Sequence, residues 1–223
     1  MILYSALFNE FHPFDQMYKW TKEVKITRPS EFLDGPGVLV IWGGEDIHPD
    51  WYGRENVASH VPIFPSRRDV LEAALFKGAV DRGIPIVGVC RGAQLGCALS
   101  GGFLIQDVTG HGIDHMITDK FGDTYMTSSL HHQMMYPWKI EHELIAWSTH
   151  ARSKHYEGLT SDEEDALNGA GSGDDLAREP EVMWFPNTKC LAIQGHPEYE
   201  RGDSPLNRHV AQYMDQYVFS IQQ

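Results

Sequence analysis

The segment from Gly83 to Gly102 constrains the fold of this chain more than any other. It reads Gly-Ile-Pro-Ile-Val-Gly-Val-Cys-Arg-Gly-Ala-Gln-Leu-Gly-Cys-Ala-Leu-Ser-Gly-Gly. The β-branched run at 84–89 predicts a buried strand, and residues 93–99 predict a short helix that ends at the glycine pair. Cys90 therefore lies at a strand-to-helix junction.

Two glycines flank Cys90, at positions 88 and 92. This is the spacing of a nucleophile elbow, with cysteine in the place of serine. Such a sharp turn leaves no room for the flanking side chains and exposes the central one. The new helix also directs free N–H groups and its positive dipole end at the sulfur, which lowers a thiol pKa. The alternative is that Cys90 is a small buried hydrophobe, the usual fate of a free cysteine.

A second stretch favours the catalytic interpretation. After a β-like run at 190–194 the chain reads Gly-His-Pro-Glu at 195–198. Pro197 moves His196 out of the helical region, and residues two apart in an extended chain point the same way. We therefore expect the Glu198 carboxylate to reach the His196 ring, which completes a set of nucleophile, base and orienting acid.

These two motifs together resemble those of the class I (triad) glutamine amidotransferases. Residues 89–94 and 196–198 carry this resemblance, which covers the chain from about Val38 to Glu198. Within the superfamily the chain is most similar to the free-standing branch of γ-glutamyl hydrolases and γ-glutamyl-GABA hydrolase. Three further stretches support that branch: Gly43-Gly44-Glu-Asp-Ile-His-Pro49 followed by Tyr52-Gly53, Arg68-Asp69-x-x-Glu72, and Ser129-Leu-His-His-Gln133.

The resemblance implies roles for further residues. The backbone N–H groups of Gly44 and Arg91 would form the oxyanion hole, where glycine allows close approach. The Gln94 side chain would help to hold a glutamyl group, together with the loop at 129–133, which acts largely through its backbone. The loop residues that match are His131, His132 and Gln133. The simpler alternatives are a tight turn at the glycine pair and a histidine-rich surface turn.

Alternating strands and helices in the first half of the chain predict a parallel sheet with helices on both faces. We expect one domain over 1–223, a three-layer α/β/α sandwich with a mostly parallel, flavodoxin-like central sheet. Ser66 is predicted to cap a helix with Asp69 reaching back to it, and Ser204 to cap the last helix. Cys90 would then lie at the carboxyl end of a strand, where such sheets place their sites.

Composition excludes several classes of function. The formal net charge of −13 argues against direct nucleic-acid binding. No apolar run reaches the length of a membrane helix, and the apolar start lacks the basic region of a secretory signal. Three cysteines cannot pair fully, and a reactive thiol prefers a reducing compartment, so a cytoplasmic location is expected.

Two stretches have more than one interpretation. Residues 157–181 carry nine acidic residues and one basic residue. Their composition predicts an acidic, Gly-rich loop insertion, either a solvated hairpin loop or a lid or docking surface beside the site. His111 and His115 have the spacing of two metal ligands on a helix, but Gly110 and Gly112 disfavour a helix, so no metal site is expected there.

The resemblance implies hydrolysis of a γ-glutamyl amide through a thioester on Cys90, with no metal or organic cofactor. If the substrate is glutamine, the ammonia would serve a synthetase on a separate chain. If the leaving amine is larger, the protein would be a stand-alone γ-glutamyl hydrolase. A third hypothesis is a catalytically silent binding protein, which the presence of Cys90, His196 and Glu198 disfavours.

Overall fold

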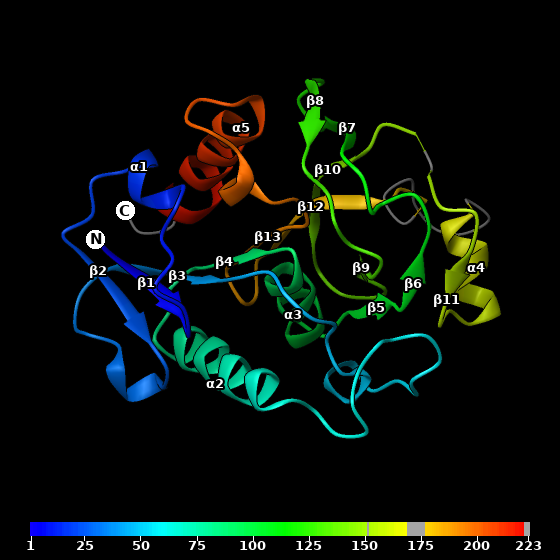
Figure 1. Ribbon diagram of the computed structural model, residues 1–223, viewed down its shortest axis with the longest axis horizontal. Helices are drawn as coiled ribbons and strands as arrows, with labels where there is room; N and C mark the ends of the chain where they lie inside the picture. The colour runs from blue at the N-terminus through cyan, green and yellow to red at the C-terminus, as the bar shows by residue number, and fades with distance from the viewer. Residues whose placement is uncertain (151, 169–176, 221–223) are drawn as a thin grey trace.

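The computed structural model describes residues 1–150, 152–168 and 177–220 (Figure 1). Its centre is a nine-stranded sheet with the strand order β2-β1-β3-β4-β13-β12-β10-β7-β8. The strands of this sheet are β1 (Ile2–Ala6), β2 (Lys22–Ile26), β3 (Gly37–Ile41), β4 (Ile86–Val89), β7 (His115–Asp119), β8 (Thr124–Thr127), β10 (Glu143–Ser148), β12 (Pro180–Phe185) and β13 (Cys190–Ile193).

The remaining elements surround this sheet. Two short antiparallel pairs are β5 (Phe103–Ile105) with β9 (Met134–Tyr136), and β6 (Asp107–Val108) with β11 (Tyr156–Glu157). The α-helices are α1 (Phe14–Met17), α2 (Arg67–Asp81), α3 (Arg91–Leu99), α4 (Ser161–Leu167) and α5 (Pro205–Tyr213). Shorter helical turns are η1 (Pro29–Glu31), η2 (Pro49–Tyr52), η3 (Pro197–Tyr199) and the π-helical η4 (Met214–Phe219).

The sheet has a parallel part and an antiparallel part. From β2 through β1, β3 and β4 to β13 every neighbouring pair is parallel, and the order 2-1-3-4 is that of a flavodoxin-like sheet. From β13 to β8 every pair is antiparallel. The expected α/β/α fold with a mostly parallel sheet is confirmed, and the antiparallel strands extend it on one side.

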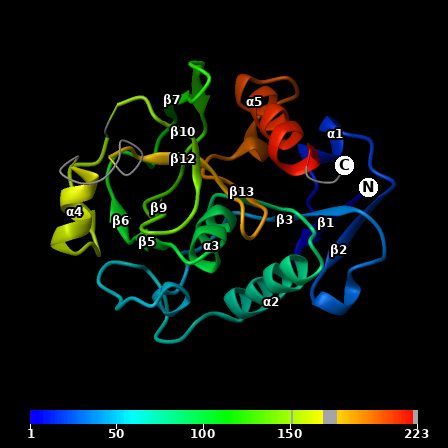
Figure 2. The same ribbon diagram turned by 180° about the vertical axis from the view of Figure 1, so that it is seen from behind.

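Helices cover both faces of the parallel strands. Helices α2 and α3 lie on one face, whereas α1 and α5 lie on the other (Figures 1 and 2). The side chains of strand β3 belong to the cores on both faces of the sheet. Leu39 and Ile41 lie in the core on the α2 side, and Val38 and Val40 lie in the core on the α5 side. This double burial explains why β3 reads as an uninterrupted apolar run.

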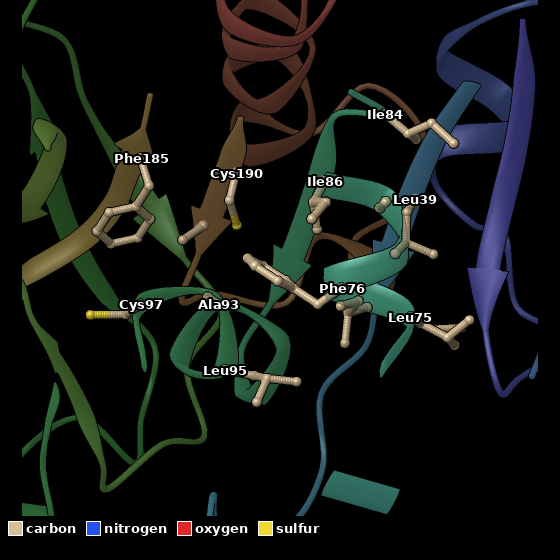
Figure 3. Packing of buried hydrophobic residues seen from close by; sticks show 14 of the residues in the cluster. Leu39, Leu75, Phe76, Ile84, Ile86, Ala93, Leu95, Cys97, Phe185 and Cys190 are labelled. Carbon is tan, nitrogen blue, oxygen red and sulfur yellow. The ribbon is translucent and has the colours of Figure 1, made fainter. Parts of the chain in front are cut away.

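The core beneath the sheet joins α2 and α3 to the central strands. Figure 3 shows Leu75 and Phe76 of α2 packed near Leu39 and Ile86, which belong to strands β3 and β4. Each of these four side chains is at most 3% exposed. Burial on this scale fixes α2 and α3 against the strand ends from which the site is built.

Helices α2 and α5 begin at the serines that the sequence predicts as caps. The Ser66 hydroxyl accepts a hydrogen bond from the Asp69 N–H at 3.0 Å, and the Asp69 carboxylate accepts one from the Ser66 N–H at 2.9 Å. Ser204 caps α5 by accepting from the Asn207 N–H at 3.1 Å. Within the described ranges, no helix combines the length and the apolar character needed to cross a bilayer.

The acidic stretch differs from the expected loop. Its first part forms helix α4, in which Glu163 is 4% exposed and pairs with Arg54 at 2.6 Å. Its last part enters β12, where Glu181 is also buried. Glu163 pairs with an arginine and Glu181 pairs with histidines, so these two carboxylates are stabilised although they are buried. Residues 169–176, which contain most of the glycines, lie outside the described residues.

Candidate active site

Cys90 lies on the sharp turn between β4 and α3. Its backbone angles are φ 49° and ψ −109°, a conformation that a non-glycine residue adopts only when its surroundings impose it. A Cβ on Gly88 would lie 2.4 Å from the Gly92 carbonyl oxygen, and one on Gly92 would lie 2.0 Å from the Ile41 carbonyl oxygen. The glycines are therefore required by close backbone packing, as the elbow pattern predicts.

His196 and Glu198 form a close pair. The His196 Nδ1 atom lies 2.8 Å from Glu198 Oε1, so the N–H donates to the carboxylate and fixes the ring. The Tyr199 ring stacks on His196 with centroids 4.6 Å apart. The chain is not extended as expected, because η3 begins directly after His196, whose φ of −114° and ψ of 79° satisfy the restriction imposed by Pro197.

The nucleophile and the base both face Gly43. A Cβ on Gly43 would lie 3.0 Å from His196 Cε1 and 3.4 Å from Cys90 Cβ. His196 Nε2 has no hydrogen-bond partner of regular geometry among the described residues. Burial alone would lower the pKa of His196, but its interactions with Cys90 and Glu198 raise it to about 10. A protonated imidazole in this position can donate a proton to a leaving group.

The other two cysteines lie in the core. Cys97 and Cys190 are both 0% exposed. Burial raises the pKa of Cys97 to about 12 and raises the pKa of Cys190 as well. Neither thiol is therefore suited to act as a nucleophile at neutral pH.

The glycine pair after β3 is held by Arg68. The Arg68 Nη2 atom donates to the carbonyl oxygens of Trp42 at 2.9 Å and Gly43 at 2.8 Å. Because the peptide bond is planar and trans, the Gly44 N–H points away from the Gly43 carbonyl and thus away from Arg68. Gly44 has φ 151°, and a Cβ there would lie 2.1 Å from Arg68 Nη1. The packing supplies a physical reason for glycine, and the oxyanion role of Gly44 stays a prediction.

Arg91 is held by two acids of α2. Its side chain is 2% exposed and forms ion pairs with Asp69 and Glu72. Glu72 also accepts from Arg68 Nε at 2.9 Å. Helix α2 thus fixes both Arg91, which follows the nucleophile, and the Gly43 carbonyl. The sequence identified Arg68-Asp69-x-x-Glu72 only by resemblance; the i, i+1, i+4 spacing of one base and two acids was the available signal.

Gln94 and Gln133 lie together beside the nucleophile helix. The Gln94 Nε2 atom donates to the Gln133 carbonyl oxygen at 2.9 Å. The Gln133 side chain accepts from the Ile47 N–H at 3.2 Å and donates to Ser59 Oγ at 2.8 Å. Both side chains therefore have internal partners, and the Gln133 amide braces the loop that follows the glycine pair.

The two loop histidines face in different directions. His132 is held between Asp46 at 2.9 Å and Asp107 at 3.0 Å. His131 is 4% exposed and packs inward, away from the protein surface. To contact a substrate, the His132 side chain would have to leave its two carboxylates, and the His131 side chain would have to leave its buried position. The substrate-binding role of this loop therefore stays a prediction and would depend on the loop backbone.

One further polar side chain lies at the nucleophile. Gln194, directly after β13, places its Nε2 atom 3.9 Å from Cys90 Sγ, and its Oε1 atom accepts from Gln94 Nε2 at 3.5 Å. Gln194 was not among the residues that the sequence singled out. Its position directly before the Gly-His-Pro-Glu stretch, at the end of a parallel strand next to β4, was the signal for it.

A cavity of about 320 Å³ adjoins the glycine pair and the acid. Its lining residues are Phe8, Glu10, Trp42, Gly43, Gly44, Glu198 and Tyr199. A larger hollow of about 460 Å³ lies between α1 and α5 and has none of the site residues in its lining. Of these two cavities, only the smaller one is lined by residues that the sequence predicts for the site, namely Gly44 and Glu198.

Comparison with known proteins places the chain in a family. Residues 21–198 match the model of the Peptidase C26 family. A provisionally named glutamine amidotransferase of Mycobacterium tuberculosis is 31% identical over 178 residues, which are 78% of this chain and 54% of the relative, so the chain spans about half of that relative's length.

Solved structures support the fold. A Thermoplasma acidophilum protein, provisionally named as part of a GMP synthase, superposes with a TM-score of 0.62 at 14% identity. The match covers 100% of this chain and 96% of that protein. The PurLQS structure from Thermotoga maritima gives a TM-score of 0.58 at 12% identity, with 100% of this chain and 99% of that chain covered. The chain belongs to the Peptidase C26 family of the class I glutamine amidotransferase-like superfamily.

Proposed function

We propose that this protein hydrolyses a γ-glutamyl amide through a covalent thioester on Cys90. The observation that carries the proposal is the arrangement of Cys90 on a strained strand-to-helix turn with the His196–Glu198 pair beside it. Strain at a buried, cysteine-bearing turn is typical of a nucleophile rather than of a core residue.

In the proposed reaction the Cys90 thiolate attacks the γ-carbonyl carbon of the substrate. The backbone N–H groups of Gly44 and Arg91 receive the oxyanion, and the first-turn N–H groups of α3 have no intrahelical acceptor. His196, protonated and oriented by Glu198, donates its proton to the leaving amine. It then takes a proton from water, which attacks the thioester and releases glutamate.

Glutamine is the proposed substrate, with ammonia passed to a synthetase on a separate chain. The name of the M. tuberculosis relative supports this assignment. The proposed site needs no metal or organic cofactor for the two acyl-transfer steps, since base, acid and oxyanion donors all come from the chain.

A stand-alone γ-glutamyl hydrolase is the second candidate. The cavity of about 320 Å³ beside Gly44 and Glu198 favours it, because three aromatic side chains line that cavity. Ammonia needs no such space, whereas a larger apolar amine would bury surface against Phe8, Trp42 and Tyr199.

A product-release assay separates the candidates. Purified protein is given glutamine and a panel of γ-glutamyl amines, and glutamate release is measured with Cys90→Ala alongside. Slow, Cys90-dependent release from glutamine alone supports an amidotransferase that lacks its synthetase. Rapid release from one larger amine supports the hydrolase. Equal release by the wild type and Cys90→Ala would contradict both and favour a binding protein.

A further inference from the structure

A cluster of three histidines and two glutamates is buried between the antiparallel strands and the 129–133 loop. It consists of residues that are 0–4% exposed and come from separate segments, namely His111, His115, His131, Glu179 and Glu181. His115 begins β7, Glu181 lies in β12, and His131 belongs to the loop that carries Gln133. None of the five has a step in the proposed reaction.

Three ring nitrogens converge on one carboxylate oxygen. Glu181 Oε1 lies 3.1 Å from His111 Nδ1, 2.9 Å from His115 Nε2 and 3.6 Å from His131 Nε2. Ligand atoms of His111, His131 and Glu181 all lie within 4.8 Å of one another. Spacings of about 3–4 Å are those between neighbouring ligand atoms around a tetrahedral ion with bonds of about 2.0–2.2 Å.

The tautomers of two histidines are fixed from outside the cluster. The Nδ1 atoms of His115 and His131 lie 3.0 Å and 2.9 Å from the carbonyl oxygens of Ile113 and Gln133. A carbonyl can only accept, so each Nδ1 carries a proton and each ring turns its Nε2 atom toward Glu181. Lone pairs of nitrogen and carboxylate oxygen repel each other unless a cation lies between them.

The third histidine is fixed in the same way by a carboxylate. His111 Nε2 lies 3.1 Å from Glu179 Oε2. Glu179 also accepts from the Arg152 N–H, the Ser153 N–H and the Tyr156 hydroxyl, each at 2.8 Å, so its oxygens are saturated. Because Nε2 faces Glu179, the Nδ1 atom of His111 is the ring nitrogen that faces Glu181 and could act as a ligand. Carboxylate- and carbonyl-bound histidines of this kind are the usual surroundings of a metal site.

Two polar atoms of the cluster have unused hydrogen-bonding capacity. His131 Nε2 and Glu181 Oε2 are buried and form no hydrogen bond with the residues that the structure describes. An imidazole nitrogen and a carboxylate oxygen are both atoms that bind zinc.

We propose that this cluster is a structural site for a zinc-like divalent cation, bound by His111 Nδ1, His131 Nε2 and the Glu181 carboxylate, with His115 Nε2 beside Glu181. Imidazole and carboxylate ligands in a buried site suit zinc. A divalent cation would balance the charge of the two buried carboxylates. The bound cation would hold the 129–133 loop against β12, and with it the Gln133 carbonyl that Gln94 contacts.

The neighbouring cluster of Asp46, His60 and His132 provides a matched control. Both ring nitrogens of His132 already have carboxylate partners, and its side chain is 33% exposed. His132 directly follows His131 in the sequence, so replacing it perturbs the same loop without touching the proposed ligands.

The test is uptake of zinc and cobalt by the whole chain. Experiments use the Cys90→Ala protein, which cannot bind metal through the active-site thiolate, and circular dichroism checks folding. After treatment with a chelator, the protein should bind one equivalent of zinc, melt at a higher temperature with zinc, and give the intense visible spectrum of tetrahedral cobalt. His132→Asn should retain all three properties, whereas His131→Asn and Glu181→Gln should lose at least ten-fold in affinity.

Two results would overturn the proposal. A chelator-treated protein that is folded and binds no zinc or cobalt overturns it, as does binding that Glu181→Gln and His131→Asn leave unchanged. If chelation unfolds the protein and zinc restores the fold, the site is supported without recourse to variants. Because the readouts are stoichiometry, spectrum and melting temperature, the test does not depend on which amide is cleaved.

Discussion

Glu198 acts on His196 through a single hydrogen bond of 2.8 Å. It fixes the tautomer of the ring and adds a negative charge that stabilises the imidazolium. Together with Cys90 it outweighs the burial of the ring and raises the pKa of His196 to about 10 from its usual 6.5. The protonated ring stabilises the fold fully below pH 6.5, and this contribution is lost as the pH rises through about 10.

We predict that Glu198→Gln lowers the pKa of His196 and slows turnover about 10²–10⁴-fold, because the amide carries no charge and no longer stabilises the imidazolium. NMR titration of the His196 ring measures the first effect, and glutamate release measures the second. Cys90 should still react with iodoacetamide. Glu200→Gln, two residues further along, is the control and should change neither. Full activity of Glu198→Gln would remove this residue from the catalytic set.

At the scale of elements, α2 is the support on which the nucleophile turn rests. One face of this helix presents Arg68, Asp69 and Glu72 to the interior, where they hold the Gly43 carbonyl and the Arg91 guanidinium. Glu72 is 0% exposed and bridges both arginines. Removing one member of such a buried network leaves an uncompensated charge, which costs far more than the loss of a surface pair.

Glu72→Gln should therefore lower the free energy of unfolding by about 3 kcal/mol, measured by urea denaturation. Asp81→Asn is the matched control on the same helix. It breaks the exposed Lys77–Asp81 pair, whose atoms lie 3.1 Å apart, and should cost no more than about 0.5 kcal/mol. Equal losses in the two variants would show that the Arg91 network does not stabilise the site.

At the scale of the whole molecule, one sheet joins the parallel and the antiparallel strands. Strand β12 pairs with β13 on one side and with β10 on the other. Helix α5 connects the two parts again, since the Tyr213 hydroxyl donates to Asp119 Oδ2 at 2.8 Å and lies 2.7 Å from the Tyr125 hydroxyl. This connectivity supports the expectation of a single domain.

We predict that both parts of the sheet unfold in one cooperative step. Amide hydrogen exchange followed by mass spectrometry should give the same opening free energy for peptides from β1 and from β10, because their strands share one hydrogen-bonded ladder. Tyr213→Phe should lower both values together, by about 1 kcal/mol. A β10 peptide that exchanges at distinctly lower free energy than β1 would indicate two independent units.

Local chemistry determined what the sequence alone could predict. The glycine spacing around Cys90, the Ser66–Asp69 capping box and the closeness of His196 to Glu198 each depend on residues at most four positions apart. These patterns join residues that are close in the sequence, so a short stretch of sequence was enough to predict them. The parallel order of the first strands followed from alternation of strands and helices.

Only the tertiary structure decided which distant charges meet. Arg91 finds Asp69 and Glu72 of another helix, and Glu181 finds three histidines 50 to 70 positions away. The composition of residues 157–181 predicted a loop because composition does not show which charged residues pair in the fold. A buried acid is stable once it is paired. The hairpin of β12 and β13 is predicted by the turn between them, but the pairing of β10 with β12 and β7 was not predicted, since it depends on contacts that no short stretch of sequence contains.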